Sequence, residues 1–372
     1  MGASAVIMDI GSKYTKLCVA TSIKGKAKIS KATHIKSPND YVLRDKGWQQ
    51  QLQVKISEMK VKGKSLRVIL NRDNINVIVG EDTITTKGLN AKAIKMGIQN
   101  KILNLTPDKS IMVNDWYVIA ENEDTITYEY AIIRKDVIDM IEKIAKDNKL
   151  NLVSIDIRMS SVVNFYKLMK EKGKFAEQDE DTINCLLYIG TKNYNLIGFT
   201  KEGIIYTKAE SNDLATLDTD LLMSQDSNNM SDGSNIGFNA DGSFAFDENA
   251  TNETSFTLKE QIGFRFNPEV TDAYNDYKRR VESGLVIKVS RQLDKMMYKG
   301  KRVGINKLYL IGSSSKLPHI DEYFANQLGA EVEIVNMDEY IVIDNSINVP
   351  NCEDMDILPE MYAIAVGNIK GV

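Results

Sequence analysis

Near its start the chain reads Val6-Ile-Met-Asp9-Ile-Gly11-Ser-Lys13-Tyr-Thr-Lys16-Leu17, and a similar stretch follows later as Cys185-Leu-Leu-Tyr188-Ile-Gly190-Thr-Lys192-Asn-Tyr-Asn195-Leu196. Four pairs of positions share one offset of about 179 residues, which chance explains poorly. The matching pairs are Asp9 with Tyr188, Gly11 with Gly190, Lys13 with Lys192, and Leu17 with Leu196. Two copies of one strand-turn-strand unit predict two related lobes, whose glycine-bearing turns face one cleft and can hold phosphates from both sides.

Composition excludes several classes of protein. The 372 residues suffice for several domain-sized units, and the net charge of -4, with Lys and Arg spread along the chain, argues against a nucleic-acid partner. Three widely spaced cysteines (Cys18, Cys185 and Cys352) argue against a disulfide framework and favour a reducing cytosol. With His34 and His319 as the only histidines, a His-rich metal site is excluded and a Ser-His-Asp triad has no support.

The sequence also carries no membrane signal. Its start reads directly as a strand, without the regions of a signal peptide, and it has no run of about 18 apolar residues. We therefore expect no direct membrane insertion, so that any membrane association needs a partner.

Hydrophobic periodicity predicts a first lobe that is interrupted by a small α+β insertion. A charged stretch over 171–182 is the expected boundary between the lobes. The expected elements before it are strands over 64–71 and 76–86, a helix over 90–103, a strand pair over 111–120 and 125–133, a helix over 135–148, a strand over 152–157 and a helix over 160–170.

The second half contains one segment of different character. Residues 224–254 are rich in Ser, Asn, Asp and Gly and predict a mobile loop or a short hairpin. The other expected elements are a long helix over 269–298, a buried strand over 307–311, a helix over 319–328 that ends at Gly329, and a C-terminal helix over 361–366.

The first turn is the strongest candidate for chemistry. Asp9 at a strand end can hold a Mg²⁺ water, Gly11 lets the turn approach a phosphate, and Ser12, Lys13 and the backbone N–H groups can donate to it. An ordinary glycine-bearing β-hairpin is the alternative. The repeat at Gly190 and a third glycine turn at Gly312 favour a nucleotide site.

Two further features carry weaker signals. Leu308-Tyr-Leu-Ile-Gly312-Ser313-Ser314-Ser315 reads as strand, tight turn and helix, either a common β-α turn or a backbone contact with a nucleoside. The charged residues of the long helix are most simply a solvated face, although one or two of them could border an adenine pocket. These residues are Arg279, Arg280, Glu282, Lys288 and Arg291.

Three turns in this order, with an insertion in the first lobe, resemble the superfamily of actin, heat-shock chaperones and sugar kinases. Within it, the chain resembles the PilM family of type IV pilus assembly, which is related to FtsA. The resemblance implies an α/β, actin-like (ribonuclease H-like) two-lobed fold with a small α+β subdomain inserted in the first lobe. It covers nearly the whole chain and is carried by residues 6–17, 75–147, 150–166, 289–294 and 305–329.

The resemblance also implies a division into domains. Lobe 1 would comprise 1–75 and 150–180, with the inserted subdomain over 76–149. Lobe 2 would comprise a core over 181–222, a small subdomain over 223–290 that includes a flexible loop at 224–254, and a second core segment over 291–372 that returns to lobe 1.

By the same resemblance, the cofactor is ATP or ADP with Mg²⁺. The first-phosphate residues would be Asp9, Gly11, Ser12, Lys13 and Lys16, with Asp9 holding Mg²⁺ through water. The second-phosphate residues would be Gly190, Thr191 and Asn193, and the nucleoside contacts would be Gly312, Ser313 and Ser314.

Three departures from the family pattern argue for weak or absent hydrolysis. Tyr188 stands where active relatives carry Asp, Ser313 where they carry a second Gly, and Arg158 where they often carry Glu. Loss of one preorganised group from a phosphoryl-transfer site can cost on the order of 10²-fold in rate. We therefore assign no catalytic residue.

The resulting expectation is a cytoplasmic, nucleotide-binding scaffold at the inner face of the membrane. Its partner would be the cytoplasmic N-terminal tail of a PilN-like inner-membrane protein, held between lobe 1 and the inserted subdomain. Further pilus platform and motor proteins, and self-association, are additional expectations. The alternatives are a slow ATPase or small-molecule kinase and an FtsA-like filament former; a heat-shock chaperone is less favoured because no substrate-binding domain follows the second lobe.

Overall fold

A computed structural model describes residues 4–23, 25–38, 42–71, 77–121, 123–175, 182–212, 214, 235–238, 244–247, 277–298, 301–302, 304–344 and 347. Cys352, the helix predicted over 361–366 and the first part of the helix predicted over 269–298 lie outside these residues. Within 224–254, the structure describes two short antiparallel strands, β12 (Asn235–Phe238) and β13 (Phe244–Asp247). The mobility predicted for that segment stays a prediction.

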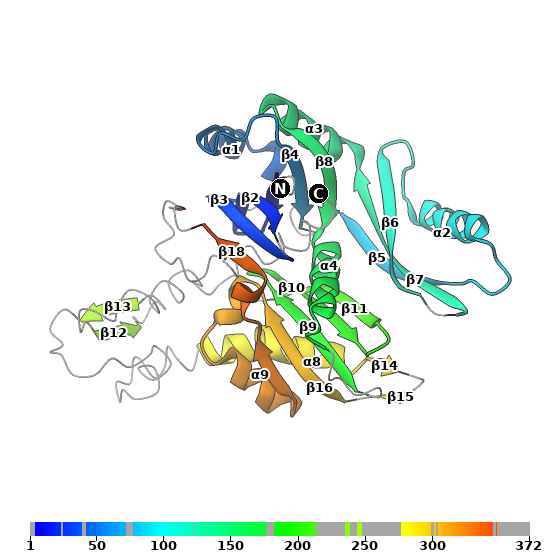
Figure 1. The fold of residues 1–372 in the computed structure, drawn as a ribbon. Coiled ribbons are helices and arrows are strands. Elements are labelled where there is room, and N and C mark those ends of the chain that lie inside the picture. The colour runs from blue at the N-terminus through cyan, green and yellow to red at the C-terminus, as the bar shows by residue number, and fades with distance from the viewer. Residues whose placement is uncertain are drawn as a thin grey trace.

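The first lobe is built on a six-stranded sheet (Figure 1). Its order is β18 (Ile341–Ile343), β3 (Lys26–Lys36), β2 (Tyr14–Ile23), β1 (Ser4–Ile10), β4 (Ser65–Leu70) and β8 (Asn151–Ile157). The predicted first hairpin is confirmed, since β1 and β2 pair antiparallel with Asp9 opposite Lys16. Strand β18 pairs in parallel with β3 and thus returns the chain from the second lobe to the first.

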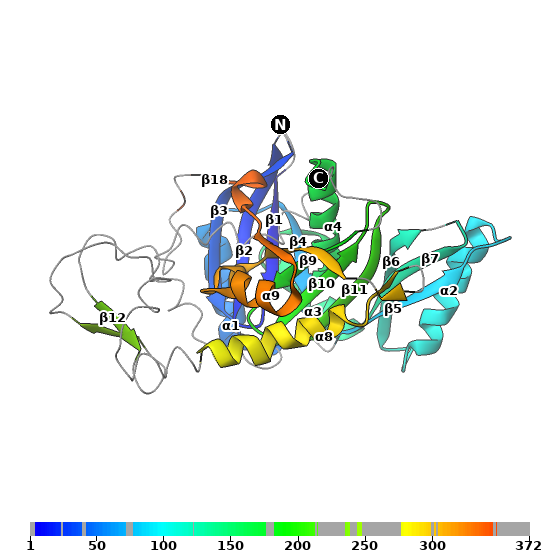
Figure 2. The same ribbon diagram turned by 90° about the horizontal axis from the view of Figure 1, so that it is seen from below.

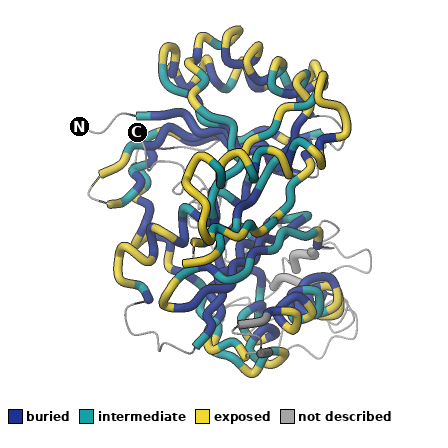
Figure 3. The backbone as a smooth tube through the Cα atoms, turned by 90° about the vertical axis from the view of Figure 1, so that its right-hand side faces the viewer, coloured by how far each residue is buried: buried dark blue, intermediate teal, exposed yellow. Residues whose placement is uncertain are grey.

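The second lobe repeats this arrangement in a five-stranded sheet. Its order is β11 (Ile204–Ser211), β10 (Asn193–Phe199), β9 (Ile183–Ile189), β16 (Ile305–Ile311) and β17 (Glu331–Ile334). Strands β9 and β10 pair antiparallel with Tyr188 opposite Asn195, so the second hairpin is also confirmed. Every residue of both strands is buried. Figure 3 shows that buried segments, in dark blue, run through the interior of the molecule. In each sheet the first strand of the repeated hairpin, β1 or β9, lies between the second strand of that hairpin and a parallel strand, β4 or β16.

Helices cover both sheets because their apolar faces need partners. Helices α1 (Lys46–Glu58) and α3 (Lys135–Asp147) pack on the outer face of the first sheet. Helix α4 (Arg158–Glu171) lies between the sheets and contributes to a core that contains residues of both. Helices α8 (Ile287–Leu293) and α9 (Ile320–Leu328) pack on the outer face of the second sheet.

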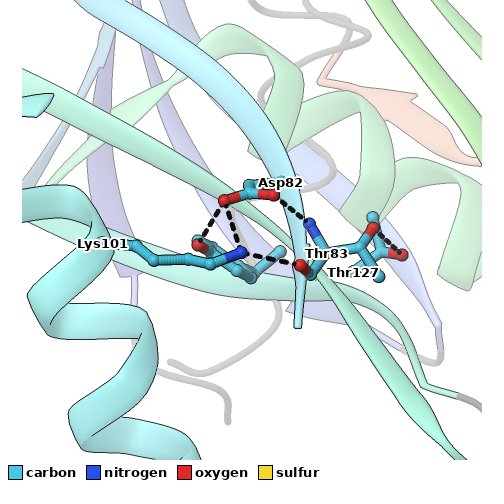
Figure 4. A network of polar contacts seen from close by, with 5 residues as sticks. Asp82, Thr83, Lys101 and Thr127 are labelled. Carbon is cyan, nitrogen blue, oxygen red and sulfur yellow. Dashed lines mark hydrogen bonds and ion pairs between the residues drawn. The ribbon is translucent and has the colours of Figure 1, made fainter. Parts of the chain in front are cut away.

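A three-stranded sheet is inserted between β4 and β8 and projects from the body (Figure 2). It consists of β5 (Ile78–Thr85), β7 (Thr125–Arg134) and β6 (Met112–Glu121), and helix α2 (Ala91–Leu105) packs on one face. Lys101 of α2 donates to Asp82 at 3.0 Å and to the Thr83 carbonyl at 2.9 Å, and Thr83 in turn contacts Thr127 (Figure 4). These polar contacts supplement the apolar packing of the helix on the sheet.

One predicted helix boundary is wrong. The helix expected to reach Tyr298 ends at Leu293, and Met297–Tyr298 form a short strand, β14, that pairs with β15 (Lys301–Arg302). The chain turns there because Lys295 N–H donates to the Gln292 carbonyl, three residues back. In the described part of the chain, no helix is long and apolar enough to cross a membrane.

Candidate functional site

The two hairpin turns are closed in the same way. The N–H of Gly11 donates to the Tyr14 carbonyl at 3.0 Å, and the N–H of Gly190 donates to the Asn193 carbonyl at 2.8 Å. A Cβ atom at Gly11 would lie 2.6 Å from the Tyr14 oxygen, and one at Gly190 would lie 3.1 Å from the Asn193 oxygen. Each turn therefore has a structural reason for glycine, whatever ligand it binds.

Arg158, the first residue of α4, connects the two lobes. Its Nη2 donates to Asp9 Oδ1 at 2.8 Å, and its Nη1 donates to Asn193 Oδ1 at 3.1 Å. Asn193 Nδ2 in turn donates to Asn71 Oδ1 at 2.5 Å. All four residues are at most 7% exposed. This network joins β1 and the end of β4 in the first sheet to β10 in the second.

The environment of Asp9 is cationic. Besides Arg158, Lys16 places its Nζ 3.7 Å from Asp9 Oδ2. A buried carboxylate requires such compensation, because an unpaired buried charge is costly. Oδ2 accepts no hydrogen bond from the described residues, so it is the oxygen that the predicted Mg²⁺-bound water would have to use.

The donor set fits a phosphate better than a metal ion. Two positive charges already lie beside the one carboxylate, and the described residues contain no group of three or more His, Cys, Asp or Glu side chains that could hold a metal. A divalent cation at Asp9 would be repelled by Arg158 and Lys16, whereas a phosphate oxygen would be attracted to them.

The ring of Tyr188 lies between the second and third glycine turns. A Cβ atom at Gly190 would lie 3.3 Å from Tyr188 Cε1, and one at Gly312 would lie 2.9 Å from Tyr188 Cε2 and 2.5 Å from the Ile189 carbonyl. Gly312 also has φ of 97°, a conformation that L side chains rarely adopt. The Arg158 guanidinium carbon lies 5.6 Å from the centre of the same ring. The tyrosine thus links the two turns and Arg158 through packing.

The other predicted residues have simpler surroundings. Lys13 lies at the first turn with its Nζ 5.7 Å from the centre of the Tyr14 ring, and Ser12 beside it is buried. Thr191 is half-buried at the second turn. Ser313 and Ser314 begin a single 3₁₀ turn, η5 (Ser313–Lys316), and Ser314 is buried. The roles of these residues toward a ligand stay predictions.

The structure brings Asp9, Lys16 and Asn193 together around Arg158, and it brings Gly190 and Gly312 together around Tyr188. The sequence reading did not predict the pairing of Arg158 with Asp9 or the part played by Asn71. Asn71 could have been suggested, because it ends a strand parallel to that of Asp9, and parallel strands end at one edge of a sheet.

Comparison with known proteins establishes the fold. No protein-family model and no curated protein matches the sequence. Among solved structures, the PilM-PilN type IV pilus biogenesis complex matches over 98% of this chain and 96% of that chain, with a TM-score of 0.62 and 14% identity. This likeness confirms the predicted actin-like, two-lobed α/β fold.

Two further solved structures are similar at lower TM-scores. MreB5 of Spiroplasma citri bound to ADP matches over 98% of this chain and 95% of that chain, with a TM-score of 0.41 and 10% identity. The cytoplasmic domain of EpsL, an inner membrane component of the type II secretion system of Vibrio cholerae, matches over 56% and 70%, with a TM-score of 0.34 and 8% identity.

Proposed function

We propose that this chain is an actin-like scaffold of a type IV pilus assembly platform, and that it binds the cytoplasmic N-terminal tail of a PilN-like inner-membrane protein. The supporting observation is its fold likeness, over 98% of its length, to a chain of the PilM-PilN type IV pilus biogenesis complex. In this proposal the chain works in the cytoplasm and is recruited to the inner face of the membrane by its partners.

A nucleotide would serve as a bridging ligand rather than as a rapidly hydrolysed substrate. Lys13, Lys16 and Arg158 supply positive charge near the two turns, and Tyr188 leaves the second turn without a carboxylate. ATP or ADP would favour a closed arrangement of the lobes by its higher affinity for that state. Mg²⁺-dependent phosphate release above about 1 per second would contradict this part of the proposal, since typical enzymes exceed that rate.

The exposed start of β8 is our candidate surface for the tail. β8 is the last strand of its sheet in the described part of the chain, and Val153 on it is 53% exposed. The inserted sheet lies close by, since Val79 of β5 and Ile155 of β8 pack against the same hydrophobic core. An extended peptide can add to such an edge through main-chain hydrogen bonds and place alternate side chains on neighbouring apolar surface.

Calorimetric titration of the full chain with the tail peptide from its own organism tests the proposal. We expect saturable micromolar binding, weakened at least about tenfold in Val153→Asp because a charge would enter an apolar contact. The matched control is Val342→Asp, which changes a valine of 43% exposure on β18, at the opposite edge of the same sheet.

The experiment tests the scaffold proposal and the choice of β8 as the docking strand separately. Absence of binding by the unchanged chain would refute the scaffold proposal. Binding that V153D leaves intact, or that V342D weakens equally, would refute β8 as the docking strand.

A further inference from the structure

A cavity of about 700 Å³ lies where three parts of the molecule meet. Its walls come from the ends of β4 and β8, from β5 of the inserted sheet, from β10 and β11, and from α8 with the turn after it. Small-molecule sites have volumes of roughly 300–1,000 Å³. The cavity therefore has the size of a ligand site and contacts lobe 1, the inserted sheet and lobe 2.

Positive charge dominates the lining. Lys288 and Arg291 lie three residues apart and so share one face of α8, and Lys295 lies in the turn after the helix. Lys208 of β11 and Arg158 of α4 line the cavity from other directions. Arg158 already pairs with Asp9, so four further cations face the one carboxylate of the lining, that of Glu210.

The charge of Glu210 is already compensated. Its Oε2 accepts hydrogen bonds from Tyr194 Oη at 3.0 Å and from Gln292 Nε2 at 2.9 Å, and its Oε1 lies 3.3 Å from Lys208 Nζ. The carboxylate is thus fixed in the wall, and the α8 cations determine the sign of the potential in the cavity.

This cavity is separate from most of the predicted nucleotide residues. Its lining includes Asn193 and Arg158 but neither Gly11–Lys13 nor Gly312–Ser314. The amides of Asn71 and Asn195 and the hydroxyl of Ser211 add uncharged donors to the lining. Several donors and cations from different directions match the oxygens of a phosphate, and Arg and Lys are the side chains that commonly bind phosphate.

We propose that this cavity binds a small, phosphate-bearing anionic ligand. Such a ligand would contact both lobes and the inserted sheet at once, so it would stabilise one arrangement of the three. The inference goes beyond the scaffold function and uses a different surface from the β8 edge. Ligand binding in the cavity can therefore be tested independently of tail binding.

The test uses the full chain and sodium pyrophosphate as the probe, titrated calorimetrically at about 0.15 M salt so that weak surface attraction is screened. We expect saturable binding near one site per chain, weakened at least about tenfold in the double variant K288Q/R291Q, which removes two charge-assisted donors. The matched control is K92Q/K95Q, which removes two exposed lysines of the same spacing on α2.

Further arms separate the cavity from other sites and other ligands. Lys13→Gln probes the first turn, which a nucleotide would contact, and should weaken pyrophosphate binding less than K288Q/R291Q does, because Lys13 does not line the cavity. Absence of saturable binding, an equal loss in both double variants, or a loss confined to Lys13→Gln would overturn the proposal. Tighter binding of a hexaglutamate peptide than of pyrophosphate would overturn the phosphate class. Circular dichroism of each variant verifies that it is folded.

Discussion

Replacement of Arg158 by methionine tests whether a buried ion pair holds the lobes together. Arg158 Nη2 lies 2.8 Å from Asp9 Oδ1, and the two side chains are 6% and 8% exposed. The variant leaves the carboxylate buried with Lys16 at 3.7 Å as its remaining cation. Breaking such a pair costs about 3–5 kcal/mol, and we expect the lower part of this range because Lys16 compensates in part and methionine fills much of the space.

A double-mutant cycle separates the pair from its parts. Asp9→Leu alone leaves a buried guanidinium and should cost a similar amount. D9L/R158M removes both charges of the pair, although Lys16 then lacks its carboxylate, so its cost should be only about 1–2 kcal/mol. Arg158→Lys keeps the positive charge but lacks the planar guanidinium that donates to both Asp9 and Asn193. Its cost in stability should therefore lie between zero and that of R158M.

Urea unfolding provides the assay, followed by tryptophan fluorescence and by far-ultraviolet circular dichroism. Trp48 and Trp116 report on the first lobe and its inserted sheet, while circular dichroism reports on the whole chain. Costs of the two single variants that simply add in the double variant would refute the proposed coupling. A cost below about 1 kcal/mol for R158M would show that the bridge does not hold the lobes.

Three further predictions concern the fold. Gly312→Ala should lower the free energy of unfolding by more than about 3 kcal/mol, because the new Cβ atom would lie 2.5 Å from the Ile189 carbonyl. Gly88→Ala, at φ of 74° but in open space, should cost only about 1–2 kcal/mol. Thermal unfolding compares the two variants, and equal costs would contradict the packing role of Gly312. Burial raises the pKa of Glu129 from its ordinary 4.5 to about 8, against the opposing hydrogen bond from Tyr117, so the stability that its protonated form contributes is complete below pH 4.5 and is lost as pH rises through about 8. Glu129→Gln should reduce the dependence of stability on pH, which for one such group is at most about 1.4 kcal/mol per pH unit. Urea unfolding midpoints at pH 5, 6.5 and 8 measure this dependence, and an unchanged dependence in the variant would contradict the role of Glu129. Asp45→Ala should cost about 1 kcal/mol, since Asp45 accepts from Trp48 N–H at 2.6 Å at the start of α1; no change in urea midpoint would show that this cap is dispensable.

Local patterns predicted much of the secondary structure. Both hairpins, the strand pair of the insertion and helices α2, α3 and α4 follow from periodicity and glycine turns, which act over a few residues. Helix α1 was not predicted, although Asp45 precedes it and the buried residues Trp48, Leu52 and Ile56 repeat every four positions. This capping residue and this spacing are sufficient to predict the helix from the sequence.

Other features depend on contacts between distant parts of the chain. The long helix was extended too far because its end is fixed by tertiary packing: Met296 is buried, with its sulfur against Gly198 of the second sheet. Arg158 and Asp9 were each singled out from the sequence, yet their pairing across 149 residues emerges only when α4 begins at the edge where β1 ends. Periodicity contains no information about such partners.

The pairing of β18 with β3 has a consequence during synthesis. Strand β3 leaves the ribosome early, but β18, which covers its outer edge, follows roughly 300 residues later, which corresponds to some tens of seconds at about 5–20 residues per second. The nascent chain must therefore keep an uncovered strand edge from joining other chains. β3 carries lysines at Lys26, Lys28, Lys31 and Lys36, the residue type that commonly discourages edge-to-edge aggregation. In the folded molecule three of these lysines contact neighbouring segments, and we expect the same charges to keep the chain from aggregating before it is complete.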